Sequence, residues 1–279
     1  MFLLKQILPA TILAMAVAAG ICGIALAWGT ERARSALAPL AMGVAYFVGH
    51  LFIVGWVRIP PSDTTNWLPF FALASAVLGA GCTVVSLSRW TRALIFALVS
   101  AGALTLLLKP KFQYGWSLGQ SLIWVAGLAC AMVLLAVVVD GLTWRPAQAL
   151  EMPVILLATC AGTFGALMLS GSVLLAQFAA VLGGAVFGSL VLSARNVALG
   201  RGIVPLVSLL LGALLVSGYF FAELPATAAV LLGFAPIFAL IPIYPQSKLL
   251  TLGVRAATVV IPILLALFLA FRASPSLDY

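Results

Sequence analysis

The chain has 279 residues, of which 65% are hydrophobic and 7% are charged. A soluble domain averages about 45–50% apolar and about 25% charged residues, so this composition excludes an ordinary water-soluble globular protein. The formal net charge of +8 needs no nucleic acid to explain it, because basic loops beside anionic lipid head groups account for it. The sequence therefore predicts a multi-pass protein whose partner is the lipid bilayer.

Long apolar runs follow one another from end to end. In hydrocarbon each segment must satisfy its own backbone hydrogen bonds, and about 20 helical residues span a bilayer core of about 30 Å. The runs predict an all-α bundle of about ten transmembrane helices with short loops, forming a single domain over residues 1–279. They cover residues 6–28, 36–56, 68–87, 93–108, 118–139, 153–170, 173–193, 204–222, 226–242 and 256–272.

The first and the sixth of these runs need separate comment. Run 6–28 contains the cleavage-like sequence Ala25-Leu26-Ala27, but it is longer than the core of a signal peptide and is predicted to remain a membrane helix. The link at 170–172 is so short that runs 153–170 and 173–193 form either a tight hairpin or one broken helix.

Lysine and arginine are unevenly divided between the two sides that such a topology defines. One side carries nine: Arg32, Arg34, Arg89, Arg92, Arg145, Arg195, Arg201, Lys248 and Arg255. The opposite side carries five: Lys5, Arg58, Lys109, Lys111 and Arg272. Because cytoplasmic loops carry the excess of positive charge, the side with nine is predicted to be cytoplasmic and both termini to lie outside.

Small residues and prolines predict how the helices pack. A four-residue spacing of small side chains lines one face of run 173–193 (Ala176, Ala180, Gly184, Gly188), of run 6–28 (Ala19, Gly23, Ala27) and of run 153–170 (Ala161, Gly165). Such faces let membrane helices approach closely. Pro236 and Pro262 fall inside predicted helices and are expected to kink them.

The chain is poor in groups that carry chemistry. It has one histidine and six carboxylates, too few to predict a catalytic centre, a metal site or a bound cofactor. The carboxylates all fall in loops, in the tail or at helix ends, which argues against a proton or sodium symporter. Among them, Asp140 and Glu151 flank Arg145 and are placed to pair with it.

His50 is the exception, because it lies inside run 36–56, about six residues from the outer end. An imidazole there needs hydrogen-bond partners, and several polar side chains are predicted on the same side. The predicted substrate-binding residues are His50, Asp63, Trp67, Gln113, Tyr114 and Gln120. Two interpretations stay open: a structural histidine that fixes its helix against the outer loops, or a substrate-contacting or pH-sensing residue in an outer polar basin.

A family resemblance is carried by residues 43–75. The stretch holds Gly49-His50, Gly55-Trp56, Pro60-Pro61, Asp63 and Trp67-Leu68-Pro69. It resembles a group of polytopic membrane proteins of planctomycete-type bacteria that carries no assigned function. The resemblance implies a location in the bacterial inner (cytoplasmic) membrane.

Three functions are compatible with this sequence. The first is permease-like transport or binding of a small or lipid-like molecule, with access through the outer basin near His50. The alternative is a non-catalytic subunit that anchors or organises a complex with other membrane subunits or with further copies of itself. The third, an intramembrane enzyme acting on lipid or isoprenoid, needs more acid–base groups than the chain provides.

Overall fold

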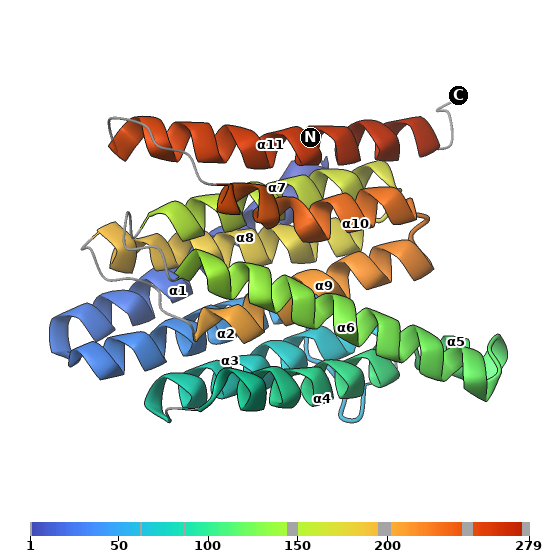
Figure 1. Cartoon of the computed structure of the whole chain (residues 1–279), viewed down its shortest axis with the longest axis horizontal. Helices are drawn as coiled ribbons and strands as arrows, with labels where there is room; N and C mark the ends of the chain where they lie inside the picture. The colour runs from blue at the N-terminus through green and yellow to red at the C-terminus, as the bar shows by residue number, and fades with distance from the viewer. Residues whose placement is uncertain are drawn as a thin grey trace.

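The computed structural model describes residues 2–61, 63–85, 87–143, 150–194, 202–241 and 248–274. The regular secondary structure of these residues is all helical (Figure 1). The length and apolar composition of the helices make the protein a polytopic integral membrane protein. The α-helices are α1 (Phe2–Trp28), α2 (Glu31–Val54), α3 (Leu68–Val84), α4 (Arg89–Leu107), α5 (Lys109–Tyr114), α6 (Leu118–Thr143), α7 (Glu151–Leu169), α8 (Val173–Ala194), α9 (Ile203–Phe221), α10 (Ala226–Phe234) and α11 (Lys248–Ala273). Two 3₁₀ helices are η1 (Thr65–Trp67) and η2 (Ala235–Leu240).

The predicted all-α bundle is confirmed, with one difference in its ninth run. Within the described ranges, nine helices are long and apolar enough to cross a membrane, whereas the tenth apolar segment, Ala226–Leu240, is shorter. It is an α-helix only as far as Phe234 and continues as the 3₁₀ helix η2. Pro236 accounts for the change, because proline lacks an N–H and its ring clashes with the carbonyl four residues earlier. Pro262, by contrast, lies within the unbroken α11.

The long helices alternate in direction across the bundle (Figure 1). Glu151 at the start of α7 pairs with Arg255 near the start of α11, so these two helices begin on the same side, the predicted cytoplasmic one. Three of the nine arginines and lysines predicted there, Arg145, Arg195 and Arg201, lie outside the described residues. The orientation itself remains a prediction from charge.

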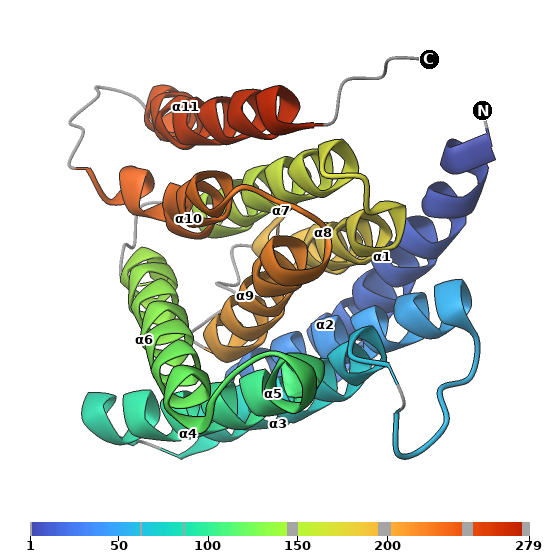
Figure 2. The ribbon, with the colours of Figure 1, turned by 90° about the vertical axis from the view of Figure 1, so that its right-hand side faces the viewer.

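Helix α9 lies at the centre of the bundle. Every residue from Ile203 to Gly218 is buried, and α9 contacts α3, α6, α8 and α10. A helix that is apolar all round is expected to be surrounded by other helices. Helix α11 lies at the edge of the bundle, where it contacts α7 and α10 (Figure 2).

Runs 153–170 and 173–193 form a hairpin rather than one broken helix. Helix α7 ends with the Ser172 N–H donating to the Leu167 carbonyl and the Gly171 N–H donating to the Met168 carbonyl. This is the Schellman arrangement, and it needs a left-handed residue, which Gly171 supplies with a φ of 82°. The turn brings α8 back alongside α7.

Small residues bring α8 and α1 together. A side chain on Gly184 would lie 2.6 Å from the Thr11 backbone oxygen, and one on Gly188 would meet the Met15 backbone oxygen. The small face predicted on run 173–193 is therefore confirmed at these two glycines. On α1 the expected face is wrong: the buried stripe is Ala10, Ala14, Ala18 and Cys22, whereas Ala27 is exposed. The expected and the observed face of α1 are offset by about one residue along the helix. Both show a four-residue spacing of small side chains, so the spacing alone does not distinguish them.

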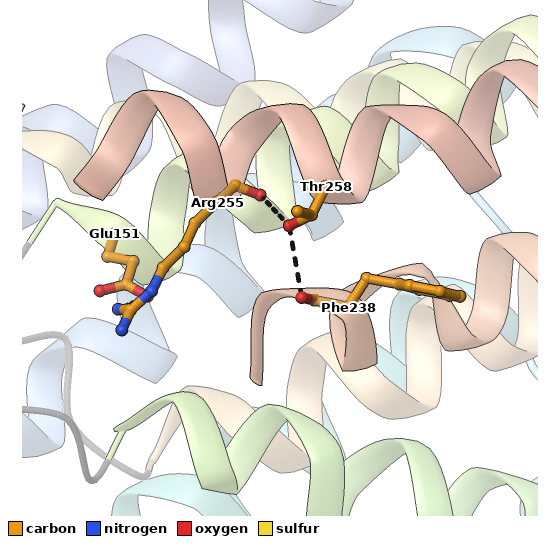
Figure 3. A network of polar contacts seen from close by, with 4 residues as sticks. All are labelled: Glu151, Phe238, Arg255 and Thr258. Carbon is orange, nitrogen blue, oxygen red and sulfur yellow. Dashed lines mark hydrogen bonds and ion pairs between the residues drawn. The ribbon is translucent and has the colours of Figure 1, made fainter. Parts of the chain in front are cut away.

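The face of α7 that meets α11 is also small. Gly162 faces Ile263, and Gly165 faces Leu267, whereas Ala161, which was expected in this face, is exposed. At the end of this interface that is predicted to be cytoplasmic, Arg255 donates to the buried carboxylate of Glu151 (Figure 3). Arg145, the expected partner of Glu151, lies outside the described residues. The partner that the structure shows is Arg255, because α11 begins several residues before the predicted 256 and carries Arg255 into the bundle.

The same interface includes a polar contact next to the ion pair. Thr258 Oγ1 lies 2.8 Å from the Arg255 carbonyl and 3.3 Å from the carbonyl of Phe238 in η2 (Figure 3). A 3₁₀ turn leaves carbonyls poorly satisfied, so a hydroxyl from a neighbouring helix stabilises it. Helix α11 thereby holds η2 as well as α7 in place.

Candidate functional site

His50 does not lie in a polar basin. Its side chain is fully buried, and its ring stacks on Phe178 of α8 with 4.2 Å between ring centroids and 15° between ring planes. Neither ring nitrogen has a hydrogen-bond partner among the described residues, and the hydroxyl of Tyr46, one turn earlier, has none either. His50 therefore packs α2 against α8 and not against the outer loops.

The other predicted site residues do not gather around His50. Asp63 is exposed and accepts a hydrogen bond from Asn66, and Gln120 accepts one from the Ser117 N–H at the start of α6. Gln113 and Tyr114 are also exposed, on the short helix α5. Trp67 is half-buried and stacks on Phe71 with 6.3 Å between centroids. Residues predicted on the same side of the bundle thus belong to separate segments with separate contacts.

A larger cavity lies instead between α3, α4, α6 and α9, toward the predicted cytoplasmic side. Its volume is about 430 Å³, within the range of ligand-binding pockets. It is lined by Leu78, Cys82, Arg89, Arg92, Ala93, Phe96, Val133, Ala136, Val137, Asp140, Gly141, Val204 and Pro205. The lining combines a long apolar wall with two arginines and one aspartate.

The directions of α4 and α6 produce this cavity. The two helices are in contact near the end that α5 joins, and they diverge toward the opposite end (Figure 1; Figure 2). Between their diverging ends lies the first turn of α9, with Val204 and Pro205 facing the space. Val137 lines the cavity and is still 59% exposed, so the apolar wall continues onto the lipid-facing surface of the bundle.

The arginines reach the cavity because α4 begins earlier than predicted. Ser88 caps the helix by accepting a hydrogen bond from the Thr91 N–H at 3.1 Å, so Arg89 and Arg92 lie on the first turn rather than in a loop. Residues three apart share a helix face, and both side chains line the cavity. The sequence signal was Ser88 followed by arginines at this spacing. Asp140 faces them from the last turn of α6.

A second, apolar groove lies on the opposite face of α6. It has a volume of about 200 Å³ and is formed by α6, α9 and α10. Trp124 and Tyr219 form the end of the groove nearest the start of α6, where Trp124 also stacks on Trp116 with 5.7 Å between centroids. Met132 projects from α6 toward Gly212 of α9 and lines the groove with it. Helix α6 therefore separates two spaces, of which one has a charged end.

Neither space contains a cluster of metal ligands. Among the described residues, no three His, Cys, Asp or Glu side chains lie close enough to share a metal ion. Compared with models of protein families, with curated proteins and with solved structures, the chain gives no match. The argument for function therefore depends on the geometry of the larger cavity.

Proposed function

We propose that this protein is permease-like and binds or moves a lipid-like molecule through the larger cavity. The observation that carries the proposal is the combination of a charged end, with Arg89, Arg92 and Asp140, and an apolar wall that continues to the lipid-facing Val137. A molecule with a polar head and an apolar tail matches both parts of this lining. Access is lateral and from the predicted cytoplasmic side, not through the outer region near His50.

Two further features support the proposal. The wall of the cavity is formed by residues from four helices, so tilting α6 relative to α4 and α9 changes its width. Apolar side chains dominate the wall, including Phe96, Val133 and Leu78, which favours contact with hydrocarbon over a hydrophilic solute.

A transport measurement with a cavity-filling variant tests the proposal. The full chain is reconstituted into phosphatidylcholine vesicles with a trace of NBD-labelled phospholipid, and dithionite reports how fast label crosses between leaflets. Ala136→Phe fills the cavity from α6 and is expected to slow the protein-dependent rate about tenfold or more, equivalent to about 1.4 kcal/mol. Ala126→Phe, on the exposed face of the same helix, is the matched control and should leave the rate unchanged. Equal rates for vesicles with and without protein would contradict transport of lipid.

We also assign the protein to the bacterial inner membrane, and a role as a non-catalytic subunit remains the alternative function. The location is supported by the resemblance of residues 43–75 and by the excess of basic residues on one side. The mass of the intact assembly, released from native membrane in mild detergent, separates the two functions. One or two chains of 29.0 kDa plus lipid favour the permease, whereas stoichiometric foreign subunits favour the alternative.

A further inference from the structure

The charged end of the larger cavity carries more positive than negative charge. Two guanidinium groups, from Arg89 and Arg92, line it with one carboxylate, from Asp140. The Nε atom of Arg92 is buried and has no hydrogen-bond partner among the described residues. A buried donor without a partner is costly, so this nitrogen favours a ligand that supplies an acceptor.

The helix ends at the cavity do not reverse this balance. Helices α4 and α9 direct their N-terminal ends toward it, and α3 and α6 direct their C-terminal ends there. Helix N-termini carry partial positive charge and helix C-termini partial negative charge, so two ends of each kind offset one another. The excess positive charge at the cavity therefore comes from its side chains, two guanidinium groups against one carboxylate.

Building on the proposed function, we propose that the ligand of the larger cavity is an anionic amphiphile with a phosphate group. The phosphate contacts Arg92, with Arg89 beside it, at the predicted cytoplasmic end. The tail lies along the wall formed by Phe96, Val133 and Val137 and leaves the bundle where Val137 faces lipid. The planar guanidinium group can donate two parallel hydrogen bonds to two oxygens of one phosphate, a bidentate contact that the lysine ammonium does not make.

Lipid retention measures this preference directly. The full chain is placed in nanodiscs of equimolar phosphatidylglycerol and phosphatidylcholine, and native mass spectrometry counts the lipids that stay bound after release. We expect wild-type protein to favour phosphatidylglycerol about tenfold, corresponding to about 1.4 kcal/mol. Arg92→Gln should bring the ratio of the two lipids close to that of the nanodisc. Arg272→Gln, which removes the same charge from the exposed end of α11, should leave the preference intact.

A conservative variant covers the case in which Arg92→Gln does not fold. Arg92→Lys keeps the charge but loses the bidentate geometry, and it should retain an intermediate preference. If wild type retains both lipids equally and Ala136→Phe retains less of each, the anionic assignment is overturned and the proposed function stands. If wild type retains no more lipid than Ala136→Phe does, the proposed function itself is contradicted.

Cys82 distinguishes a lipid head group from a soluble phosphate compound. Its thiol lines the cavity and is half-buried, whereas Cys22 and Cys160 are buried in the bundle and Cys130 is exposed. Cys130→Ser removes the exposed thiol, so that intact mass reports on N-ethylmaleimide labelling of Cys82. In that variant, labelling should be slowed by phosphatidylglycerol and not by millimolar inorganic phosphate. Protection by inorganic phosphate alone would reject the amphiphile in favour of a soluble phosphate compound.

Discussion

In one half of the bundle, α1, α2, α7, α8 and α11 approach one another through small residues. In the other half, side chains such as Met132 and Leu135 of α6 lie between α6 and α9, and two unfilled spaces adjoin them. We call these the close-packed half and the cavity half. In the first, Gly184 lies against the backbone of Thr11. In the second, Gly127 of α6 faces open space, and the interfaces are formed by residues such as Leu135 and Val133.

The difference shows what decides whether membrane helices close on each other. Lipid tails are as apolar as the helices, so association depends on packing contacts rather than on removal of apolar surface from water. Small residues let two backbones touch along their length, whereas branched side chains hold them apart and leave unfilled space when directions diverge. In α8, Gly184 and Gly188 face the backbone of α1, whereas in α6 Gly127 faces open space and Gly141 lines the larger cavity. Small residues therefore close an interface only where they face the backbone of a neighbouring helix.

The ion pair of the close-packed half provides the test with the largest expected effect. Replacing Arg255 by Met leaves the buried Glu151 carboxylate without a partner and should cost about 3–5 kcal/mol of unfolding free energy. Unfolding in mixed detergent micelles measures it, with the exposed Arg272→Met as control. The double variant Glu151→Leu/Arg255→Met should recover most of the loss. A single variant as stable as wild type would show that packing alone holds α11 in place.

The same substitution in both halves compares them most directly. Gly184→Ala places a methyl group 2.6 Å from a backbone oxygen and should cost about 1–3 kcal/mol, because α1 and α8 must separate. Gly212→Ala meets the flexible side chain of Met132 at 2.9 Å beside the apolar groove, and should change stability by less than about 0.5 kcal/mol. Similar losses from both variants, measured by unfolding in the same micelles, would remove the distinction between the halves.

His50 tests a polar group inside the close-packed half. His50→Phe keeps a ring against Phe178 and removes two nitrogens that have no partner, so stability should rise by about 1 kcal/mol. His50→Ala should instead lower it by about 2 kcal/mol through the cavity that it creates. Thermal unfolding of the two variants in detergent reports both values. A loss of stability in His50→Phe would indicate that the imidazole nitrogens do have partners in the membrane.

Filling the larger cavity should have the smallest effect on stability. Ala136→Phe places a ring in existing space and should change the free energy of unfolding by less than about 0.5 kcal/mol, as should the lipid-facing Ala126→Phe. Unfolding midpoints in the same detergent provide the comparison. A strongly destabilised Ala136→Phe would mean that α4 and α6 lie closer together in the membrane and that the cavity half resembles the close-packed half.

Composition and the length of the apolar runs determined the class and nine of the ten predicted long helices, because a bilayer imposes one requirement on every segment. The requirement is a continuous apolar helix about 20 residues long, and it can be checked for each run by itself. Only Ala226–Leu240 is shorter, because its α-helix ends next to Pro236. The four-residue spacing of Gly184 and Gly188 likewise predicted which face of α8 packs against α1, because helical spacing and residue size can both be read from the sequence.

The tertiary structure alone decided which polar residues share a site. His50, Asp63 and Gln120 lie on one side of the bundle and yet make separate contacts, whereas Arg92 and Asp140 come from different helices and line one cavity. Likewise Glu151 pairs with Arg255, which lies 104 residues away in the sequence. The physical reason is that helix direction and rotation set these distances, and both depend on how all the side chains of an interface fit together.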